Sequence, residues 1–309
     1  MKRLVAISFL LLCVVFLQQT ARSESKTYKI IVPGTYTISG KSKSQMQTFT
    51  EEIVAALSNV LGEKIEMVYS PKIEEAYIKD AITQLVSHKV DLVGFSGDWY
   101  AKMSPQMREK FLPLLVLVIN GKKNTNYCLY VRKSDGITKV DQLRGKRLST
   151  YVYKDVRYLL YKAGIDQPLE KFFGEVLYQT VLPLDLMKML TDEKIDAFVS
   201  SDYQVDLSRG IDPAFKNIVP VQCAEYTLNP FFLYSKDLDP EVVDKVKKAM
   251  VSWKTDKRFQ KLKLFFVAIK GGVSDVKPED LNTSIEVDKL IVSKGWETER
   301  KEFIKRHSK

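Results

Sequence analysis

The stretch from residue 28 to residue 95 alternates short apolar runs with amphipathic segments, and this alternation constrains the fold more than any other feature. Apolar residues at three- and four-residue spacing predict helices over 44–61 and 73–85. The apolar runs around them predict strands at Tyr28–Val32, Ile65–Tyr69 and Val90–Phe95. Strands joined by helical crossovers with short links require a parallel sheet, so we expect an α/β fold.

A second α/β unit follows a pair of apolar segments. Leu114–Ile119 and Tyr127–Val131 flank a polar turn and predict a hairpin, where we place a first crossing between domains. The unit itself has predicted strands ending near Ser149, Val181 and Val199, with helices starting near Lys154 and at Pro183. The pattern changes again near Ile218, which predicts a second crossing, and the basic tail after Lys254 is expected to be mostly helical.

The N-terminus has the pattern of a secretory signal. Lys2 and Arg3 precede an apolar run over 4–17, and small residues at Ala21 and Ser23 suit a signal peptidase. We therefore expect residues 1–23 to be a cleaved signal peptide and the protein to be soluble and periplasmic, the alternative being an uncleaved anchor helix. The remaining chain has a globular composition, 45% hydrophobic and 28% charged, and a length that suits two domains.

Charge and cysteine usage exclude several classes of partner. The net charge of +10 is spread along the chain rather than gathered in one dense block, so no nucleic-acid partner is expected. No residues have metal-ligand spacing, and neither a metal nor a cofactor is predicted. Outside the signal, the cysteines are Cys128 and Cys223. An oxidising compartment permits a disulfide between them, and two buried thiols are the alternative.

Loops at strand ends carry the candidate ligand residues. In open α/β sheets, ligands bind at the carboxyl ends of the strands. The sequence places hydroxyls, carboxylates and aromatics at these positions, although a core-filling turn explains some of them equally well. The candidates are Thr35, Tyr36, Ser96, Asp98, Trp99, Tyr100, Ser149, Thr150, Tyr151, Asp202 and Tyr203.

These candidates leave two ligand classes open. Ser149 and Thr150 precede a predicted helix, whose free N–H groups suit an anion, but plain capping is an equal explanation. The aromatic residues suit a ring or a cation, and Asp98 and Asp202 together suit an ammonium group.

Several segments together resemble a known family. They are the strand of residues 90–95, Asp141-Gln142-Leu143-Arg144-Gly145-Lys146-Arg147, the strand of residues 195–198, and Ser235-Lys236-Asp237-Leu238-Asp239-Pro240. The chain resembles the periplasmic substrate-binding proteins of ABC importers, in the phosphate, phosphite and phosphonate branch. The resemblance implies a type II, two-lobed fold, each lobe a mixed, mainly parallel sheet flanked by helices, with a two-segment hinge. The first lobe would hold residues 27–118 and 228–309, and the second would hold residues 119–227.

The resemblance implies a solute-binding component that works with a membrane ABC permease. A small phosphate- or phosphonate-like or other polar ligand would lie between the lobes of a monomer. Family members carry small residues where Tyr151 and Tyr153 stand here. No catalytic constellation is evident, since there is no Gly-x-Ser-x-Gly motif and the histidines are His88 and His307, so we do not expect an enzyme. The alternative is a sensing partner of a membrane receptor or kinase that binds an amine or aromatic metabolite.

Overall fold

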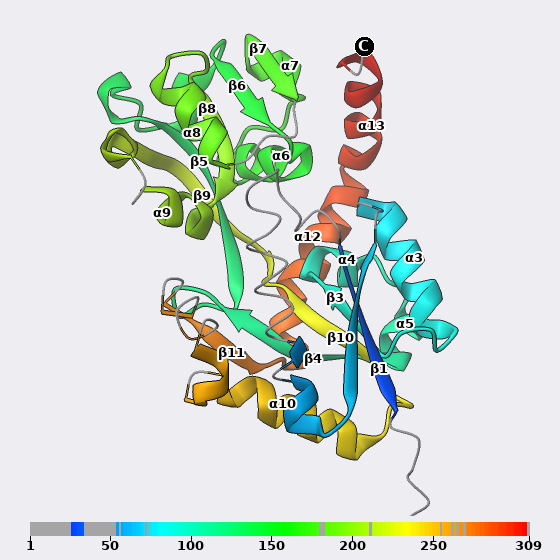
Figure 1. The fold of residues 1–309 in the computed structure, drawn as a ribbon. Helices are drawn as coiled ribbons and strands as arrows, with labels where there is room; N and C mark the ends of the chain where they lie inside the picture. The colour runs from blue at the N-terminus through cyan, green and yellow to red at the C-terminus, as the bar shows by residue number, and fades with distance from the viewer. Residues whose placement is uncertain are drawn as a thin grey trace, which may run out of the picture.

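The chain folds into two lobes, each built on one sheet with helices on both faces (Figure 1). The computed structural model describes residues 26–307 except 34–53, 56, 71, 73, 179–182, 210–211, 254, 261–262, 264–265 and 268–269. Among these residues, no helix is both long and apolar enough to cross a membrane.

The first lobe contains a six-stranded sheet in the order β11-β4-β10-β3-β1-β2. Its strands are β1 (Thr27–Pro33), β2 (Lys64–Ser70), β3 (Leu92–Phe95), β4 (Phe111–Val118), β10 (Phe231–Ser235) and β11 (Gly272–Asp275). Its helices include α3 (Glu74–Val86), α4 (Gly97–Ala101), α5 (Pro105–Lys110) and α10 (Pro240–Ser252). β1 pairs in parallel with β2 and β3, as the alternation predicts, whereas β10 runs antiparallel to β3 and β4.

Both faces of this sheet are covered because its strands alternate. Along β1, Tyr28 and Ile30 pack with residues of α10, while Ile31 points to the opposite face and packs with Tyr77 of α3. Tyr77 also donates a hydrogen bond of 2.7 Å from its hydroxyl to the carbonyl oxygen of Gly94. A buried side chain of α3 therefore holds the last part of β3, just before the loop that follows it.

The second lobe contains a five-stranded sheet in the order β7-β6-β8-β5-β9. Its strands are β5 (Asn124–Arg132), β6 (Arg147–Thr150), β7 (Glu175–Tyr178), β8 (Ala197–Ser201) and β9 (Ile218–Leu228). Its helices are α6 (Tyr153–Lys162), α7 (Leu169–Phe172), α8 (Pro183–Thr191) and α9 (Asp202–Arg209). β6 is parallel to β7 and β8, and β5 is antiparallel to β8 and β9.

The predicted hairpin between 114–119 and 127–131 is wrong. β4 and β5 belong to different sheets, and a single bridge between Ile119 and Lys122 closes the turn that joins them. Each strand has two other neighbours, β10 and β11 for β4 and β8 and β9 for β5. With both hydrogen-bonding edges occupied, the two strands cannot pair with each other. The segment therefore passes from one lobe to the other.

A disulfide joins β5 to β9. Cys128 and Cys223 lie directly opposite each other in the antiparallel ladder and are bonded. Of the two alternatives left by the sequence, the structure has the disulfide rather than two thiols. The bond connects residues 95 positions apart and ties together the two strands that lead toward the first lobe.

The tail adds a third crossing to the two that were predicted. It first contributes the edge strand β11, in a region expected to be mostly helical. Helix α12 (Asn282–Ser293) then lies on the first lobe, where Ser284 Oγ accepts a 3.0 Å hydrogen bond from the amide of Leu228. Helix α13 (Trp296–His307) packs on the second lobe, and its fully buried Phe303 lies 5.1 Å from the ring of Tyr153. The residue boundaries of the lobes stay a prediction.

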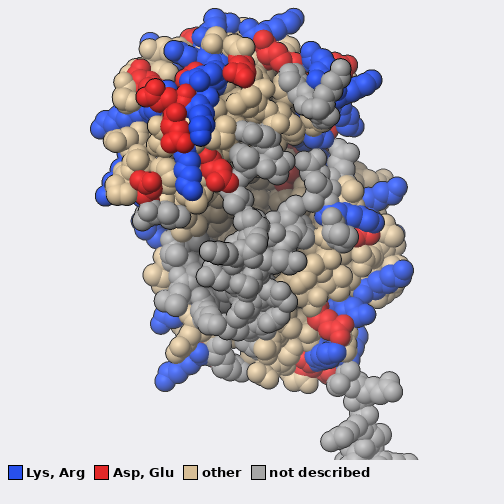
Figure 2. All heavy atoms as spheres, turned by 45° about the horizontal axis from the view of Figure 1, so that its top comes forward, with Lys and Arg blue, Asp and Glu red and all other residues tan. Residues whose placement is uncertain are grey.

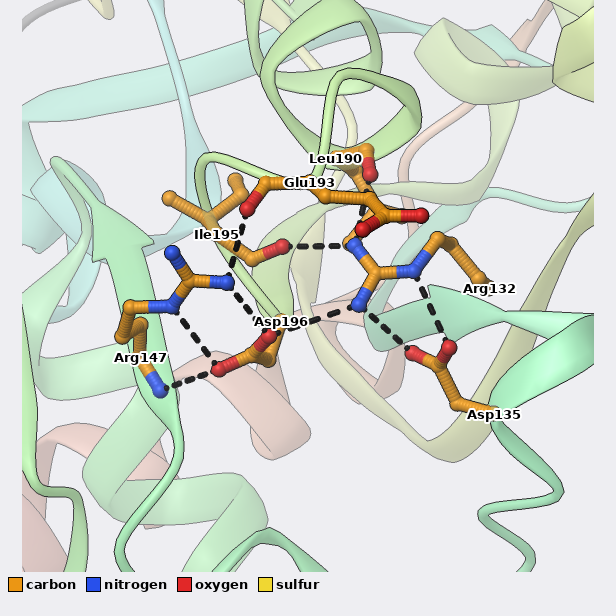
Figure 3. A network of polar contacts seen from close by, with 7 residues as sticks. All are labelled: Arg132, Asp135, Arg147, Leu190, Glu193, Ile195 and Asp196. Carbon is orange, nitrogen blue, oxygen red and sulfur yellow. Dashed lines mark hydrogen bonds and ion pairs between the residues drawn. The ribbon is translucent and has the colours of Figure 1, made fainter.

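A polar network holds the far end of the second sheet (Figure 3). Asp196, just before β8, accepts hydrogen bonds from Arg147 of β6 and from Arg132 of β5. Arg132 also donates to the carbonyl oxygens of Leu190 and Ile195, at 2.7 and 2.8 Å. The carboxylate of Asp196 thus links β5 to β6, and Arg132 links them to the end of α8.

Candidate functional site

The loop after β3 forms helix α4 and packs tightly against the crossing segments. Gly97 is where α4 touches β9 and α12. A Cβ there would lie 2.3 Å from Ser284 Oγ and 2.6 Å from the amide nitrogen of Leu228. Glycine is therefore required by close approach. It is flanked by Ser96, whose hydroxyl donates a 2.5 Å hydrogen bond to Asp98 and so orients that carboxylate.

The two aromatic residues of this loop point in different directions. Trp99 lines a cavity and also contacts the ring of Tyr77, with centroids 4.9 Å apart. Tyr100 is buried in the core against Phe231, and it does not line that cavity. Because successive helical residues differ by about 100° in direction, one short helix sends neighbouring side chains to the site and to the core.

The cavity has a volume of about 130 Å³ and lies between the lobes. Its walls come from α4 and the residue that follows it, from the loop and first turn of α6, from the end of β7 and from α13. The lining residues are Asp98, Trp99, Lys102, Tyr151, Val152, Tyr153, Lys154, Asp155, Tyr178 and Arg300. Three of the sequence candidates, Asp98, Trp99 and Tyr151, are thus brought together.

Ser149 and Thr150 lie beneath this surface. Both are fully buried, and neither lines the cavity. The hydroxyl of Thr150 accepts a 3.0 Å hydrogen bond from the amide of Val152, the residue that precedes α6. The structure therefore uses Thr150 to form the turn that sends Tyr151, Val152 and the start of α6 into the cleft.

Asp202 and Tyr203 lie at the start of α9, away from the cavity lining. Asp202 accepts a 2.7 Å hydrogen bond from the amide of Tyr203, and burial raises the pKa of its carboxyl. The half-buried ring of Tyr203 packs against the core of the first lobe, so it contacts the opposite lobe from across the cleft. The other two candidates, Thr35 and Tyr36, lie outside the described residues.

A chain of charges borders the cavity. Lys154 Nζ lies 3.1 Å from one oxygen of Glu297, and Arg300 donates to the other oxygen at 2.8 Å. Burial opposes ionisation of Glu297, but the hydrogen bond from Arg300 and the charge of Lys154 outweigh it and lower the pKa of Glu297 to about 2. Burial and the nearby Lys154 lower the pKa of Lys102.

Asp155 is the buried carboxylate of the site. Only 7% of its surface is exposed, and burial, reinforced by the charge of Asp98, raises the pKa of its carboxyl to about 7. Lys154 and Lys102 act in the opposite direction without overcoming burial. The site therefore contains a carboxyl group that changes charge near neutral pH.

Sequence reasoning did not include seven of the lining residues among its candidates. Those from 152 to 155 continue the loop after β6, and the strand-end rule extended by one helical turn finds them. Lys102 lies one turn beyond Asp98, by the same rule. Tyr178 ends β7, and Arg300 has no local signal because it reaches the site through the packing of α13.

In the described part of the chain, no group of three or more His, Cys, Asp or Glu is placed to hold a metal ion.

Comparison with known families gives one match that spans most of the chain. Residues 36–281 match the model of the ABC transporter, phosphonate, periplasmic substrate-binding protein family. A search of curated proteins finds no match.

Solved structures of low sequence identity share the fold. PhnD1 from Prochlorococcus marinus, in complex with methylphosphonate, has a TM-score of 0.63 at 12% identity over 87% of this chain and 99% of its own. XAC2383 from Xanthomonas citri, bound to ATP, has a TM-score of 0.60 at 18% identity over 90% and 99%. The aliphatic sulphonate binding protein SsuA from Escherichia coli has a TM-score of 0.51 at 11% identity over 86% and 87%. At these identities the likeness establishes the two-lobed fold.

Proposed function

Because the chain belongs to the family of periplasmic substrate-binding proteins of ABC phosphonate transporters, we propose that its cavity between the lobes captures the solute. The observation that carries this proposal is that one cavity has walls from both lobes. A solute that contacts both walls stabilises the closed arrangement, which is the form that a membrane ABC permease would recognise.

The cavity size restricts the solute. A cavity of about 150 Å³ accommodates a molecule the size of benzene, so about 130 Å³ suits roughly six non-hydrogen atoms. Asp98, Trp99 and Tyr151 would contact the solute, with Ser96 orienting Asp98. Methylphosphonate fits this size, whereas a nucleotide does not.

Three further features complete the proposal. The protein acts without catalysis, as a monomer, after export through a cleaved signal peptide of residues 1–23. Acidic and basic side chains alternate over the second lobe in Figure 2, which supports a solvated surface rather than a nucleic-acid interface. The lobes would comprise residues 27–118 with 228–309, and residues 119–227, with α13 reaching across to the second.

Fluorescence of Trp99 offers a direct test, since Trp253 and Trp296 are buried elsewhere. Phosphate, methylphosphonate, ethanesulfonate and choline are titrated into the protein, together with calorimetry and thermal melting. We expect one class to change the fluorescence and raise the melting temperature, with the fluorescence change lost in Trp99→Phe and binding lost in Val152→Trp. Thr298→Trp, on the exposed side of α13, is the control for added bulk. Binding that survives Val152→Trp in a folded protein would place the solute elsewhere.

A further inference from the structure

Two of the three cations that line the cavity, Lys154 and Arg300, share one carboxylate of α13. Both bond to Glu297. Glu297 lies beyond residue 281, where the match to the phosphonate-binding family ends. An incoming anion would therefore have to compete with a carboxylate that this chain supplies itself.

The two carboxylates of the cavity form no direct ion pair with a described residue, although Lys154 and Lys102 are close enough to act on Asp155. Asp155, although nine-tenths buried, forms no ion pair with any residue in the described part of the chain, and its carboxylate is bonded by its own amide. Asp98, from the opposite lobe, accepts the hydroxyl of Ser96 and likewise has no ion pair with a described residue. A buried carboxylate without a directly paired cation is costly, because Lys154 and Lys102 do not overcome the burial of Asp155, and a cation placed between the two aspartates would relieve that cost.

Aromatic rings complete the same walls. Trp99, Tyr151, Tyr153 and Tyr178 line the cavity beside the two aspartates. Aromatic faces attract cations, most strongly where water is excluded. The hydroxyls of Ser149 and Thr150, which suit an oxyanion by residue type, are fully buried and do not reach the cavity.

From this arrangement we infer that the cavity selects a small organic cation, a primary or quaternary amine, over a bare phosphonate or phosphate. The inference rests on the proposed solute-binding function and names its ligand class. Lys102 is the lining cation that opposes it. Lys102 has no ion pair with a described carboxylate, and burial together with Lys154 disfavours its charged form. Glu297 sets the selectivity, because without it Lys154 and Arg300 would turn the cavity toward anions.

Calorimetric titration with a matched pair of probes tests this inference. Choline carries a quaternary ammonium group, 3,3-dimethylbutan-1-ol is its uncharged analogue of the same shape, and methylphosphonate represents the anions. We expect choline to bind at least about tenfold more tightly than the alcohol, the factor given by about 1.4 kcal/mol of cation attraction. Asp155→Asn should lower choline affinity by about tenfold or more, and Glu297→Gln should lower it while raising that of methylphosphonate. Glu302→Gln, on the exposed side of α13, should change neither.

Two results would overturn the inference. One is choline affinity that is unchanged in folded Asp155→Asn protein. The other is methylphosphonate binding more tightly than choline to the unmodified protein. If methylphosphonate binds and Val152→Trp abolishes its binding, the solute-binding function stands and the cation selectivity fails. If all three probes bind equally well to Val152→Trp, both fail.

Discussion

Arg147 donates hydrogen bonds to the carboxylate of Asp196 from both its guanidinium group and its backbone amide. The guanidinium nitrogens Nε and Nη2 lie 3.1 and 2.8 Å from the two carboxylate oxygens, and the amide nitrogen lies 2.9 Å away. Arg132 adds a fourth contact at 3.3 Å (Figure 3). The hydrogen bonds from Arg147 outweigh burial and hold the pKa of the Asp196 carboxyl well below its usual range.

Replacing Asp196 should weaken the second lobe. Asp196→Asn removes the charge that both arginines share, and we expect a loss of about 2 kcal/mol in the free energy of unfolding at pH 7. A carboxyl whose pKa is depressed by folding stabilises the protein fully above its unfolded pKa of about 4, and this contribution declines below that value until the pH passes the depressed pKa of the folded protein. Urea unfolding at pH 7 and pH 3 should show a smaller difference between the two proteins at pH 3 than at pH 7. Asp192→Asn, at an exposed pair with Lys194, is the matched control and should cost almost nothing.

The disulfide should account for a measurable part of the stability. It closes a loop of 95 residues between Cys128 and Cys223, so its loss in the double variant Cys128→Ser/Cys223→Ser should lower the free energy of unfolding by about 2–5 kcal/mol. A reducing agent should destabilise the original protein to a similar extent and leave the double variant unchanged. A reductant effect of equal size in both proteins would contradict this origin.

Gly97 should tolerate no side chain. In Gly97→Ala the new methyl group would meet Ser284 Oγ and the backbone of Leu228, and the backbone atom cannot move without disturbing β9. We expect a loss of about 1–3 kcal/mol. Gly94→Ala provides a graded comparison, since its nearest neighbour is a flexible Val32 methyl at 3.2 Å. Thermal melts that rank Gly94→Ala as the more damaging change would show that the close approach at Gly97 is not limiting.

Asp155 should make the stability depend on pH near neutrality. Because burial raises the pKa of its carboxyl from 3.8 to about 7, the folded protein holds a proton that the unfolded chain releases. Stability should therefore fall as the pH rises from about 4 to about 7. Asp155→Asn should remove this part of the dependence and gain on the order of 1–4 kcal/mol at pH 8. Denaturant midpoints from pH 4.5 to 8.5 measure the effect, with Asp206→Asn, which is exposed on α9, as the control.

Local periodicity was enough to locate most of the secondary structure, because burial of one helix face or strand face leaves a repeat in the sequence. Local periodicity does not predict which strands pair with each other. β4 and β5 read as a hairpin because they are adjacent apolar runs, yet their neighbours come from β10, β11, β8 and β9. No local pattern states which edge of a sheet is still free.

The position of the cavity was predictable, but its lining only in part. The strand-end rule points to Asp98, Trp99 and Tyr151, which line the cavity because chain topology brings those loops together, while their role in ligand binding stays a prediction. The rule does not distinguish Trp99, which lines the cavity, from Tyr100, which is in the core. That difference in direction arises from helix α4, which the strand-end rule does not predict. Asp155, Glu297 and Arg300 depend on how α6 and α13 pack, which is settled by contacts between segments far apart in the chain.

The tail changes the kind of motion that this molecule can make. Two lobes joined only through β5 and β9 could rotate about a single hinge formed by those strands. The passage from α12 to α13, through the turn at Lys294 and Gly295, links the two lobes again, and Arg300 of α13 lines the cavity. The lobes are therefore connected both through the strands and through this turn. A change in the angle between the lobes must change the backbone at both connections. Gly295 has a left-handed φ of 68°, a conformation that glycine adopts without steric cost, so this turn can absorb such a change.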